Sequence, residues 1–199
     1  LFRSLQRSLD WIALQDLAPE AFEVILCCEI DVAEVEPCLE DGRPFVMEVC
    51  EGIESSLKAC EGRWVLLLDP GALPAADCFR HHLNAHSQVG RAVAVVGAVE
   101  LAVDSRTTPL LEVLASTSLL DDPIGLMGCT QPRGGSASCN YSLPREALEG
   151  VEPEEIWRGG LEICVQEGLG LKAIHEPAIR VYQEVDLDLE TFQAHCFQL

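Results

Sequence analysis

The chain has 199 residues, 48% of them hydrophobic and 23% charged, and its formal net charge is −20. This length and composition are typical of one globular domain whose core needs no disulfide or metal. Its 13 Lys and Arg residues are scattered, which argues against a nucleic-acid partner. No apolar run reaches the roughly 18 residues of a membrane span, so we expect no transmembrane segment.

In chain order the periodicity predicts alternating helices and strands. We expect helices at 3–16, 52–62, 74–87, 109–120, 144–149, 154–168 and 188–197, and strands at 22–28, 44–49, 63–69, 91–103, 171–177 and 178–184. Gly62 is expected to end its helix, and Pro74 to occupy the first turn of another. Gly97 suggests a bulge or a close backbone approach. The longest irregular stretch, 121–137, is rich in Gly and Pro.

This alternation predicts a three-layer α/β sandwich with a mostly parallel central sheet and helices on both faces. The strand ends at Cys28, Asp69 and near Gly97 would then meet at one edge, where ligands bind in open α/β sheets. We expect one domain over 1–199 that belongs to a longer chain, because the sequence lacks a starting Met and a signal peptide.

Ten cysteines occur without any C-x-x-C pair. We therefore interpret them as reduced core residues of a cytoplasmic protein. His82 and His86 lie four apart, which is metal-ligand spacing, but no third ligand is evident and we interpret them as surface histidines. His175 is expected to be a partly buried residue of a strand.

The stretch "WVLLLDPGALP" (64–74) places Asp69 at the end of an apolar strand. Two roles remain open for its carboxylate. It can be a metal ligand, or it can cap the tight turn that Pro70 and Gly71 favour by accepting backbone N–H groups nearby.

Four ordered blocks resemble the family 2 glycosyltransferases, which have the GT-A nucleotide-sugar transferase fold. The blocks are "LQDLAPEAFEVILCC", "LKACEGRWVLLLDPGALPAADCFRHHLNAH", "GGSASCNYSLPREALEGV" and "GLEICVQEGLGLKAIHEPAIRVYQE". The resemblance implies a GT-A-like domain whose first strand is absent or lies before Leu1. It also implies transfer of a sugar from a nucleotide diphosphate to an acceptor hydroxyl.

The family's catalytic positions are depleted in this sequence. The resemblance places Asp69 on the first aspartate of the family's metal-binding D-x-D, whereas the second falls on Gly71. The base aspartate falls on a glycine, which leaves Glu162, or Glu154 upstream, as the remaining candidates. The metal-binding histidine falls on Gln183. A divalent metal, Mn²⁺ or Mg²⁺, is implied only if the protein is active.

The donor- and acceptor-side positions keep more of the pattern. By resemblance, Glu29 would contact the nucleoside. The N–H groups of Gly134 and Gly135, with Arg133 beside them, would bind the diphosphate. Asn140 and Arg145 match the acceptor-side positions.

Two hypotheses follow for the whole chain. In the first it is a glycosyltransferase with weak or lost activity, acting on a nucleotide sugar and on a glycan or lipid-linked acceptor. In the second it is a pseudoenzyme that binds a protein partner or a glycan.

Overall fold

The computed structural model of the chain describes residues 2–28, 35, 42–68, 71–89, 93–101, 140–148 and 172–183. The elements in this part are α1 (Phe2–Ile12), η1 (Pro19–Ala21), β1 (Glu23–Cys28), β2 (Val46–Glu51), α3 (Gly52–Ala59), β3 (Trp64–Leu67), β4 (Ala72–Pro74), α4 (Cys78–Val89), β5 (Val93–Leu101), β6 (Tyr141–Pro144), η4 (Arg145–Leu148) and β7 (Lys172–Gln183).

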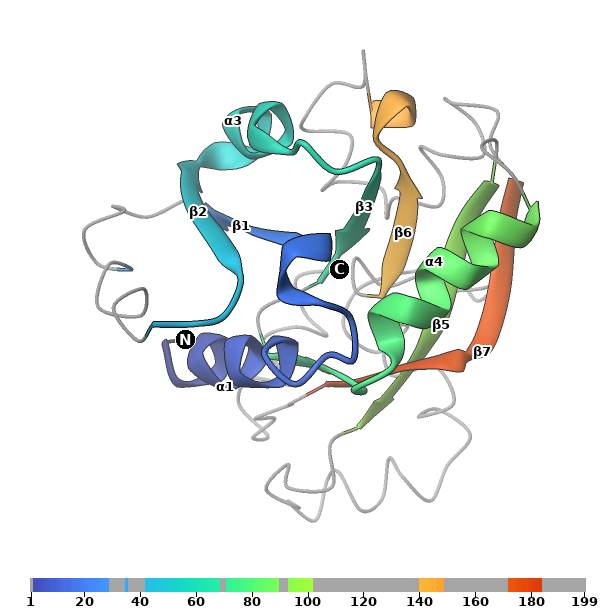
Figure 1. Ribbon diagram of the computed structural model, residues 1–199, viewed down its shortest axis with the longest axis horizontal. Coiled ribbons are helices and arrows are strands. Elements are labelled where there is room, and N and C mark those ends of the chain that lie inside the picture. Colours follow the sequence, from blue (N-terminus) through green and yellow to red (C-terminus); the bar gives the residue numbers. More distant parts are fainter. Residues whose placement is uncertain are drawn as a thin grey trace, which may run out of the picture.

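These strands form two sheets (Figure 1). β1 and β2 pair in parallel, and the larger sheet has the order β3-β6-β5-β7-β4. Within the larger sheet β5 and β7 are parallel, whereas β3–β6, β5–β6 and β4–β7 are antiparallel. The expectation of a mostly parallel central sheet is therefore not confirmed. The difference arises because β6 runs antiparallel to its neighbour β3, and β4 runs antiparallel to its neighbour β7.

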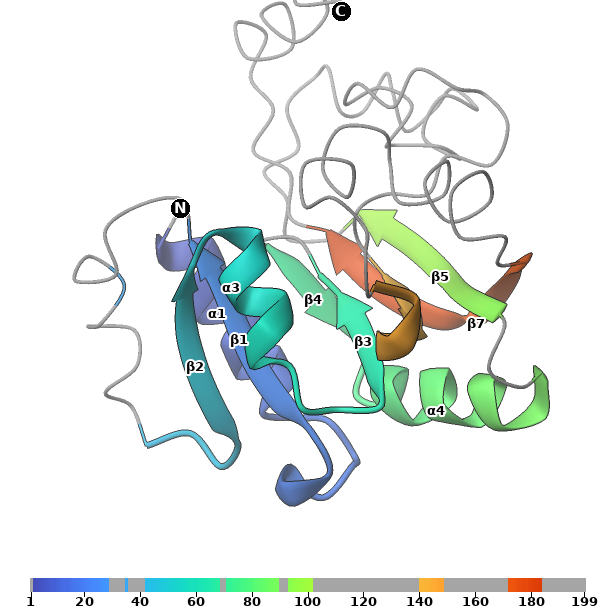
Figure 2. The same ribbon diagram turned by 90° about the horizontal axis from the view of Figure 1, so that it is seen from above.

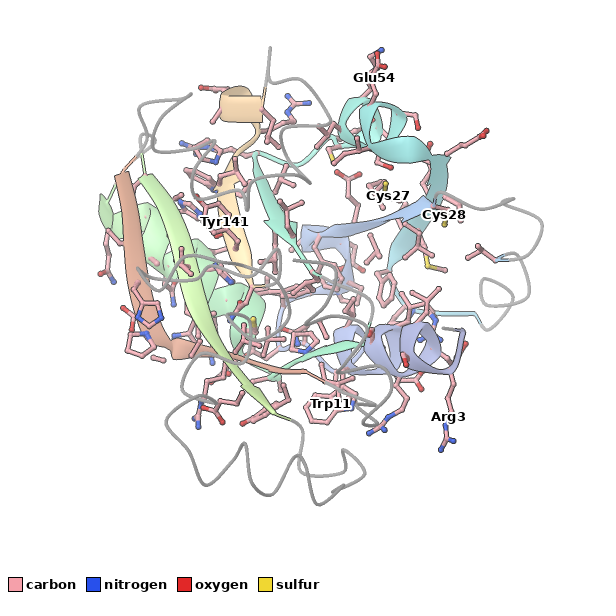
Figure 3. The ribbon with its side chains drawn as sticks, turned by 180° about the vertical axis from the view of Figure 1, so that it is seen from behind. Arg3, Trp11, Cys27, Cys28, Glu54 and Tyr141 are labelled. Atoms are coloured by element: carbon pink, nitrogen blue, oxygen red, sulfur yellow. The ribbon has the colours of Figure 1, made fainter. Side chains whose placement is uncertain are left out.

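α1 covers β1 and β2 with the apolar side of an amphipathic helix. Leu9 and Ile12 are buried with Phe45, and Leu5, Val24 and other partly buried apolar residues pack against them. Trp11 reaches the far end of β7, where its ring meets that of Tyr182 edge-on at 6.0 Å between centroids (Figure 3). The 3.6-residue repeat of Leu5, Leu9 and Ile12 thus becomes a packing surface.

α4 lies across one face of the larger sheet (Figure 2). Cys78 and Ala85 on this helix are buried against the sheet residues Val95, Ile179 and Val181. Gln15, after α1, fixes the segment that precedes α4. Its side-chain amide donates to the carbonyl of Ala75 at 2.8 Å, and its oxygen accepts the N–H of Phe79 at 3.1 Å.

Several predicted boundaries need correction. Pro74 does not begin a helix but ends β4, where it pairs with Val181, and the helix starts at Cys78. The helix predicted to end at Gly62 ends at Ala59. The two strands expected at 171–184 are one strand, β7. The helices predicted at 109–120, 154–168 and 188–197 lie outside the described residues, as does the stretch 121–137.

The cysteines and His175 also differ from expectation. Cys27, Cys28, Cys50, Cys60 and Cys78 are free, as predicted. Cys50 and Cys78 are buried, but Cys27, near the end of β1 (Figure 3), is exposed. His175 is exposed rather than partly buried.

Candidate functional site

The candidate site lies at the edge where β3 ends and β6 begins. The N–H of Asn140 donates to the carbonyl of Leu67 at 3.0 Å, and the carbonyl of Asn140 accepts the N–H of Gly97 at 2.9 Å. Asn140 therefore joins the end of β3 to the middle of β5. This is the edge to which the sequence assigned Asp69, which follows Leu67 by two residues.

The side chain of Asn140 is fully buried, and each of its polar atoms has a partner. Its Nδ2 donates to the carbonyls of Ala98 at 2.7 Å and Ile179 at 3.1 Å. Its Oδ1 accepts from His82 Nε2 at 2.9 Å and lies 3.7 Å from Cys78 Sγ. Two carbonyls can only accept, so they fix which end of the amide is nitrogen. The acceptor contact expected of Asn140 stays a prediction beside this observed structural role.

Ser142 extends the same set of contacts toward His86. Ser142 Oγ lies 2.7 Å from His82 Nδ1 and 2.8 Å from His86 Nε2. Asn140 Oδ1 can only accept, so His82 carries its proton on Nε2 and, when neutral, accepts the Ser142 hydroxyl proton on Nδ1. Ser142 in turn accepts the Nε2 proton of His86. We call Cys78, His82, His86, Asn140 and Ser142 the α4–β6 polar cluster.

The two histidines are not surface residues, which corrects the sequence-based interpretation. His82 is 3% exposed and His86 is 2% exposed. Desolvation lowers the pKa of each from 6.5 to about 4, and at His82 the charges of His86 and His81 add to this lowering while the hydrogen bond to Asn140 opposes it. His86 also stacks on Trp64, with 4.0 Å between ring centroids. Both side chains are therefore neutral parts of the core at pH 7.

The position that aligns with the second aspartate of D-x-D is also buried. Gly71 has a φ of 86°, a left-handed conformation that favours glycine. Its N–H donates to Ser8 Oγ on α1 at 3.0 Å. This N–H is one of the donors expected for an Asp69 cap, and in the structure Ser8 accepts it. Any side chain at position 71 would therefore be attached to a buried backbone whose conformation is strained for residues other than glycine.

Arg145 and Asn140 lie at opposite ends of β6. In the β3–β6 pair, Leu67 is opposite Tyr141 and Trp64 is opposite Pro144. Arg145 Nη1 donates to the carbonyl of Cys60 at 2.9 Å, next to the start of β3. A four-residue strand spans about 13 Å, so the structure does not bring these two predicted acceptor residues together.

The other predicted site residues lie outside the described part of the chain. These are Glu29, Asp69, Arg133, Gly134, Gly135, Glu154 and Glu162. No group of three or more His, Cys, Asp or Glu residues that could hold a metal ion occurs among the described residues.

Sequence reasoning missed the α4–β6 polar cluster as a unit. Its signal was present, because Cys78, His82 and His86 recur every four residues on one helical face. Asn140 and Ser142 are two apart and so share one face at the start of a strand. The pattern alone did not reveal that these two faces meet.

No protein-family model matches the chain, and no curated protein matches it. Solved structures do. S. aureus TarS 1-349 in complex with UDP-GlcNAc is similar with a TM-score of 0.57 and 14% identity, over 96% of this chain and 57% of that one. The complex of TarS 1-349 with UDP is similar with a TM-score of 0.54 and 15% identity, over 96% of this chain and 59% of that one. A mycobacterial protein is similar with a TM-score of 0.51 and 19% identity, over 96% of this chain and 67% of that one.

At these identities the likeness concerns the fold. The chain has an α/β fold similar to that of these structures, and it spans less than two thirds of the TarS chains. In the part of the chain that the structure describes, no helix is long and apolar enough to cross a membrane.

Proposed function

We propose that this chain is a nucleotide-sugar-binding, glycosyltransferase-like domain whose transfer activity is weak or lost. One observation carries the proposal. Over 96% of its length, the chain has a fold similar to the structures of a protein in complex with UDP and with UDP-GlcNAc. The geometry supports it further, because the end of β3, the start of β6 and the middle of β5 meet at Asn140. Ligands of open α/β sheets bind at edges of this kind.

The donor-side roles follow the sequence. Asp69 comes two residues after Leu67, and Glu29 comes directly after β1. In the proposal these carboxylates face the nucleotide sugar, and Arg133, Gly134 and Gly135 bind its diphosphate through N–H groups and positive charge. Glu162 or Glu154 would take the proton of the acceptor hydroxyl if transfer occurs. Arg145 remains a proposed acceptor-side residue, whereas Asn140, whose side chain is buried and fully hydrogen-bonded, would act on the acceptor side through the backbone that it holds.

The described residues do not fit a divalent-cation site at this edge. The oxygen of Asn140 is occupied by His82, and position 71 is a buried glycine that faces Ser8. Asp69 would be the sole carboxylate from the D-x-D position. We therefore derive no metal-dependent step, and we treat dependence on Mn²⁺ or Mg²⁺ as a question for experiment.

The second candidate function is that of a pseudoenzyme that binds a protein or glycan partner. The observation that favours it is the use of position 71, where the Gly71 N–H donates to Ser8 on α1. A position that would have to supply a second carboxylate has become part of the contact between α1 and the turn before β4. In this reading the fold persists while the chemistry is lost.

Isothermal titration calorimetry with UDP, UDP-GlcNAc and a GDP-sugar, with and without Mn²⁺, tests the proposal. We expect UDP and UDP-GlcNAc to bind with a Kd between about 1 µM and 1 mM, the range of ordinary substrate affinities. We expect this binding without Mn²⁺. No binding of any nucleotide would refute the proposal and leave the partner-binding alternative.

The variant Asp69→Ala separates an active enzyme from a binding domain. If nucleotide binding requires Mn²⁺ and is lost in Asp69→Ala, the enzyme reading is favoured, and an assay for sugar release from UDP-GlcNAc should then show turnover. If binding is independent of Mn²⁺ and Asp69→Ala weakens it without abolishing it, the weak or inactive form of the proposal stands.

A further inference from the structure

The α4–β6 polar cluster connects a helix to the candidate site without facing solvent. Asn140 is its member nearest the site, because its backbone joins Leu67 of β3 to Gly97 of β5. His82 is its member on α4 that bonds Asn140 directly. Asn140 is therefore the direct link from this histidine to the site.

Asn140 has a conformation that its surroundings must hold in place. Its φ is 64°, the one positive φ of a non-glycine residue in the described part of the chain. Such a conformation is costly for most residues, Asn adopts it more readily than others, and here neighbouring contacts fix it. Here the contacts are two backbone hydrogen bonds and those of the side chain.

Asn140 also fills a break in the ladder between β5 and β7. The register shifts between Gly97, opposite Glu176, and Ala98, opposite Arg180. Asn140 Nδ2 donates to the carbonyls of Ala98 on β5 and Ile179 on β7, one on each strand at this shift. The amide thus satisfies two carbonyls at the irregularity, and it ties both strands to the start of β6.

His82 is the strong donor to the oxygen of this amide, whose nitrogen end the two carbonyls fix. Its Nε2–H is 2.9 Å from Asn140 Oδ1, whereas the thiol of Cys78 lies at 3.7 Å and is a weak donor. Without the imidazole, Asn140 Oδ1 would be buried with only the thiol beside it. A buried acceptor that loses its partner is unfavourable, so the arrangement around Asn140 would be destabilised, while the two carbonyls still keep Nδ2 in place.

We propose that His82 is a positioning residue, which acts through Asn140 to hold the end of β3 and the start of β6 in the arrangement that binds a nucleotide sugar. The positioning itself follows from the contacts above, and its effect on ligand affinity rests on the proposed function. Asp69 is two residues after Leu67, and Gly135 is five residues before Asn140. The proposed donor-binding residues Asp69 and Gly135 are therefore connected in the chain to Leu67 and Asn140, the two residues that the His82–Asn140 contact helps to hold in place.

The test compares His82→Leu with His82→Gln. Leucine fills the space without a donor, while the glutamine amide can still donate to Asn140 Oδ1. Hydrogen exchange measured by NMR at the N–H groups of Asn140 and Gly97 reports the positioning without any ligand. Calorimetry with UDP-GlcNAc reports its effect on the site. Circular dichroism and urea unfolding establish that each variant is folded.

Two matched controls separate positioning from general loss of stability. Ser142→Ala removes a contact of His82 and of His86 but leaves the His82–Asn140 hydrogen bond intact. His81→Gln changes the neighbouring histidine, which faces Asp77 on the helix surface. We expect His81→Gln to keep the parent's affinity for UDP-GlcNAc within about twofold, and Ser142→Ala to lower it less than His82→Leu does.

In His82→Leu we expect exchange at Asn140 and Gly97 to accelerate about 10-fold or more relative to Ser142→Ala, and affinity for UDP-GlcNAc to fall by a similar factor. His82→Gln should recover most of both effects. Equal exchange in His82→Leu and Ser142→Ala would overturn the proposal, whatever the ligand result. So would faster exchange with unchanged affinity.

Failure of the proposed function has a different signature. If the parent binds neither UDP nor UDP-GlcNAc, the proposed function falls, and the ligand part of this inference falls with it. The exchange data then decide whether His82 positions Asn140, because they require no ligand.

Discussion

Asn140 and Gly97 depend on each other. A Cβ atom added to Gly97 would lie 2.2 Å from Asn140 Nδ2 and 2.6 Å from the carbonyl oxygen of Ile179. The sequence predicted a bulge or a close backbone approach at Gly97. Both are confirmed, because the β5–β7 register shifts between Gly97 and Ala98, and the backbone carbonyl of Ile179 approaches Gly97 beside the Asn140 side chain. The glycine is needed for its lack of a side chain, since its φ is not in the left-handed range.

We expect Gly97→Ala to lower the free energy of unfolding by about 1–3 kcal/mol, because the methyl group must displace Asn140 or the β7 backbone. Urea unfolding followed by circular dichroism measures this. Gly62→Ala is the control, because its Cβ would meet its nearest neighbour, the carbonyl oxygen of Trp64, at 3.3 Å and should cost less than about 1 kcal/mol. Equal effects of the two substitutions would contradict the argument.

Restoring the second aspartate of D-x-D should not restore a metal site. We expect Gly71→Asp to lower the free energy of unfolding by about 1–3 kcal/mol, because a φ of 86° is strained for a side chain and the position is buried. Thermal melting with and without Mn²⁺ should show no added stabilisation by the metal. Gly71→Ala isolates the backbone strain from the charge. Stabilisation of Gly71→Asp by Mn²⁺, absent in the parent, would reverse this conclusion.

At the scale of elements, α4 presents a polar stripe to the interior. The helix keeps Ala85 and Cys78 for apolar packing, and on the same side places two neutral histidines against Asn140 and Ser142. Buried polar groups of this kind specify one position of the helix on the sheet, because a shift of the helix would leave hydrogen-bond donors or acceptors without partners. The position of α4 on the sheet is therefore fixed by directional hydrogen bonds as well as by buried apolar area.

This arrangement predicts that acid destabilises the protein. The folded-state pKa of His82 and His86 is about 4, below the 6.5 of the unfolded chain. The unfolded state therefore binds more protons between these values, so stability is full above about pH 6.5 and falls as the pH drops toward 4. We expect each histidine to contribute a loss of about 1–3 kcal/mol over this window, measured by urea unfolding at a series of pH values.

The double variant His82→Gln, His86→Gln gives the matched comparison. Subtracting its pH profile from that of the parent removes the titration of the carboxylates, which both proteins share. We expect the difference to grow as the pH falls. Parallel profiles for the parent and the double variant would show that the two histidines take up protons as readily in the fold as in the unfolded chain, contrary to their burial.

At the scale of the whole molecule, negative charge dominates. The chain has 33 Asp and Glu residues against 13 Lys and Arg. Described ion pairs such as Lys58–Glu54 and Arg80–Asp16 are on the surface and contribute little. Repulsion among the remaining carboxylates opposes the compact state, and dissolved salt screens it.

We therefore expect stability to rise with salt. Raising NaCl from about 20 mM to about 0.5 M should increase the free energy of unfolding by roughly 1 kcal/mol at neutral pH, because the Debye length shrinks below the spacing of surface charges. Urea unfolding at each salt concentration measures the change, and KCl should act alike, since the effect depends on ionic strength. A decrease with salt would mean that the ion pairs outweigh the repulsion.

The sequence by itself determined the α/β class, the position of most strands and the free state of the described cysteines. Strands such as β1 and β5 are readable because a run of apolar β-branched residues has few alternatives in water. The resemblance carried by four ordered blocks also indicated the fold that the solved structures share. These features depend on neighbours in the chain, so local pattern suffices.

Only the tertiary structure decided the sheet directions, the burial of His82 and His86, and the separation of Asn140 from Arg145. A polar side chain is buried when a distant segment supplies its partners, and here α4 meets β6 across about 60 residues of sequence. Whether β6 runs parallel or antiparallel to β3 likewise depends on how the intervening chain returns, which no local period records. The spacing of Cys78, His82 and His86 was visible in the sequence, but the partners that make it meaningful were not.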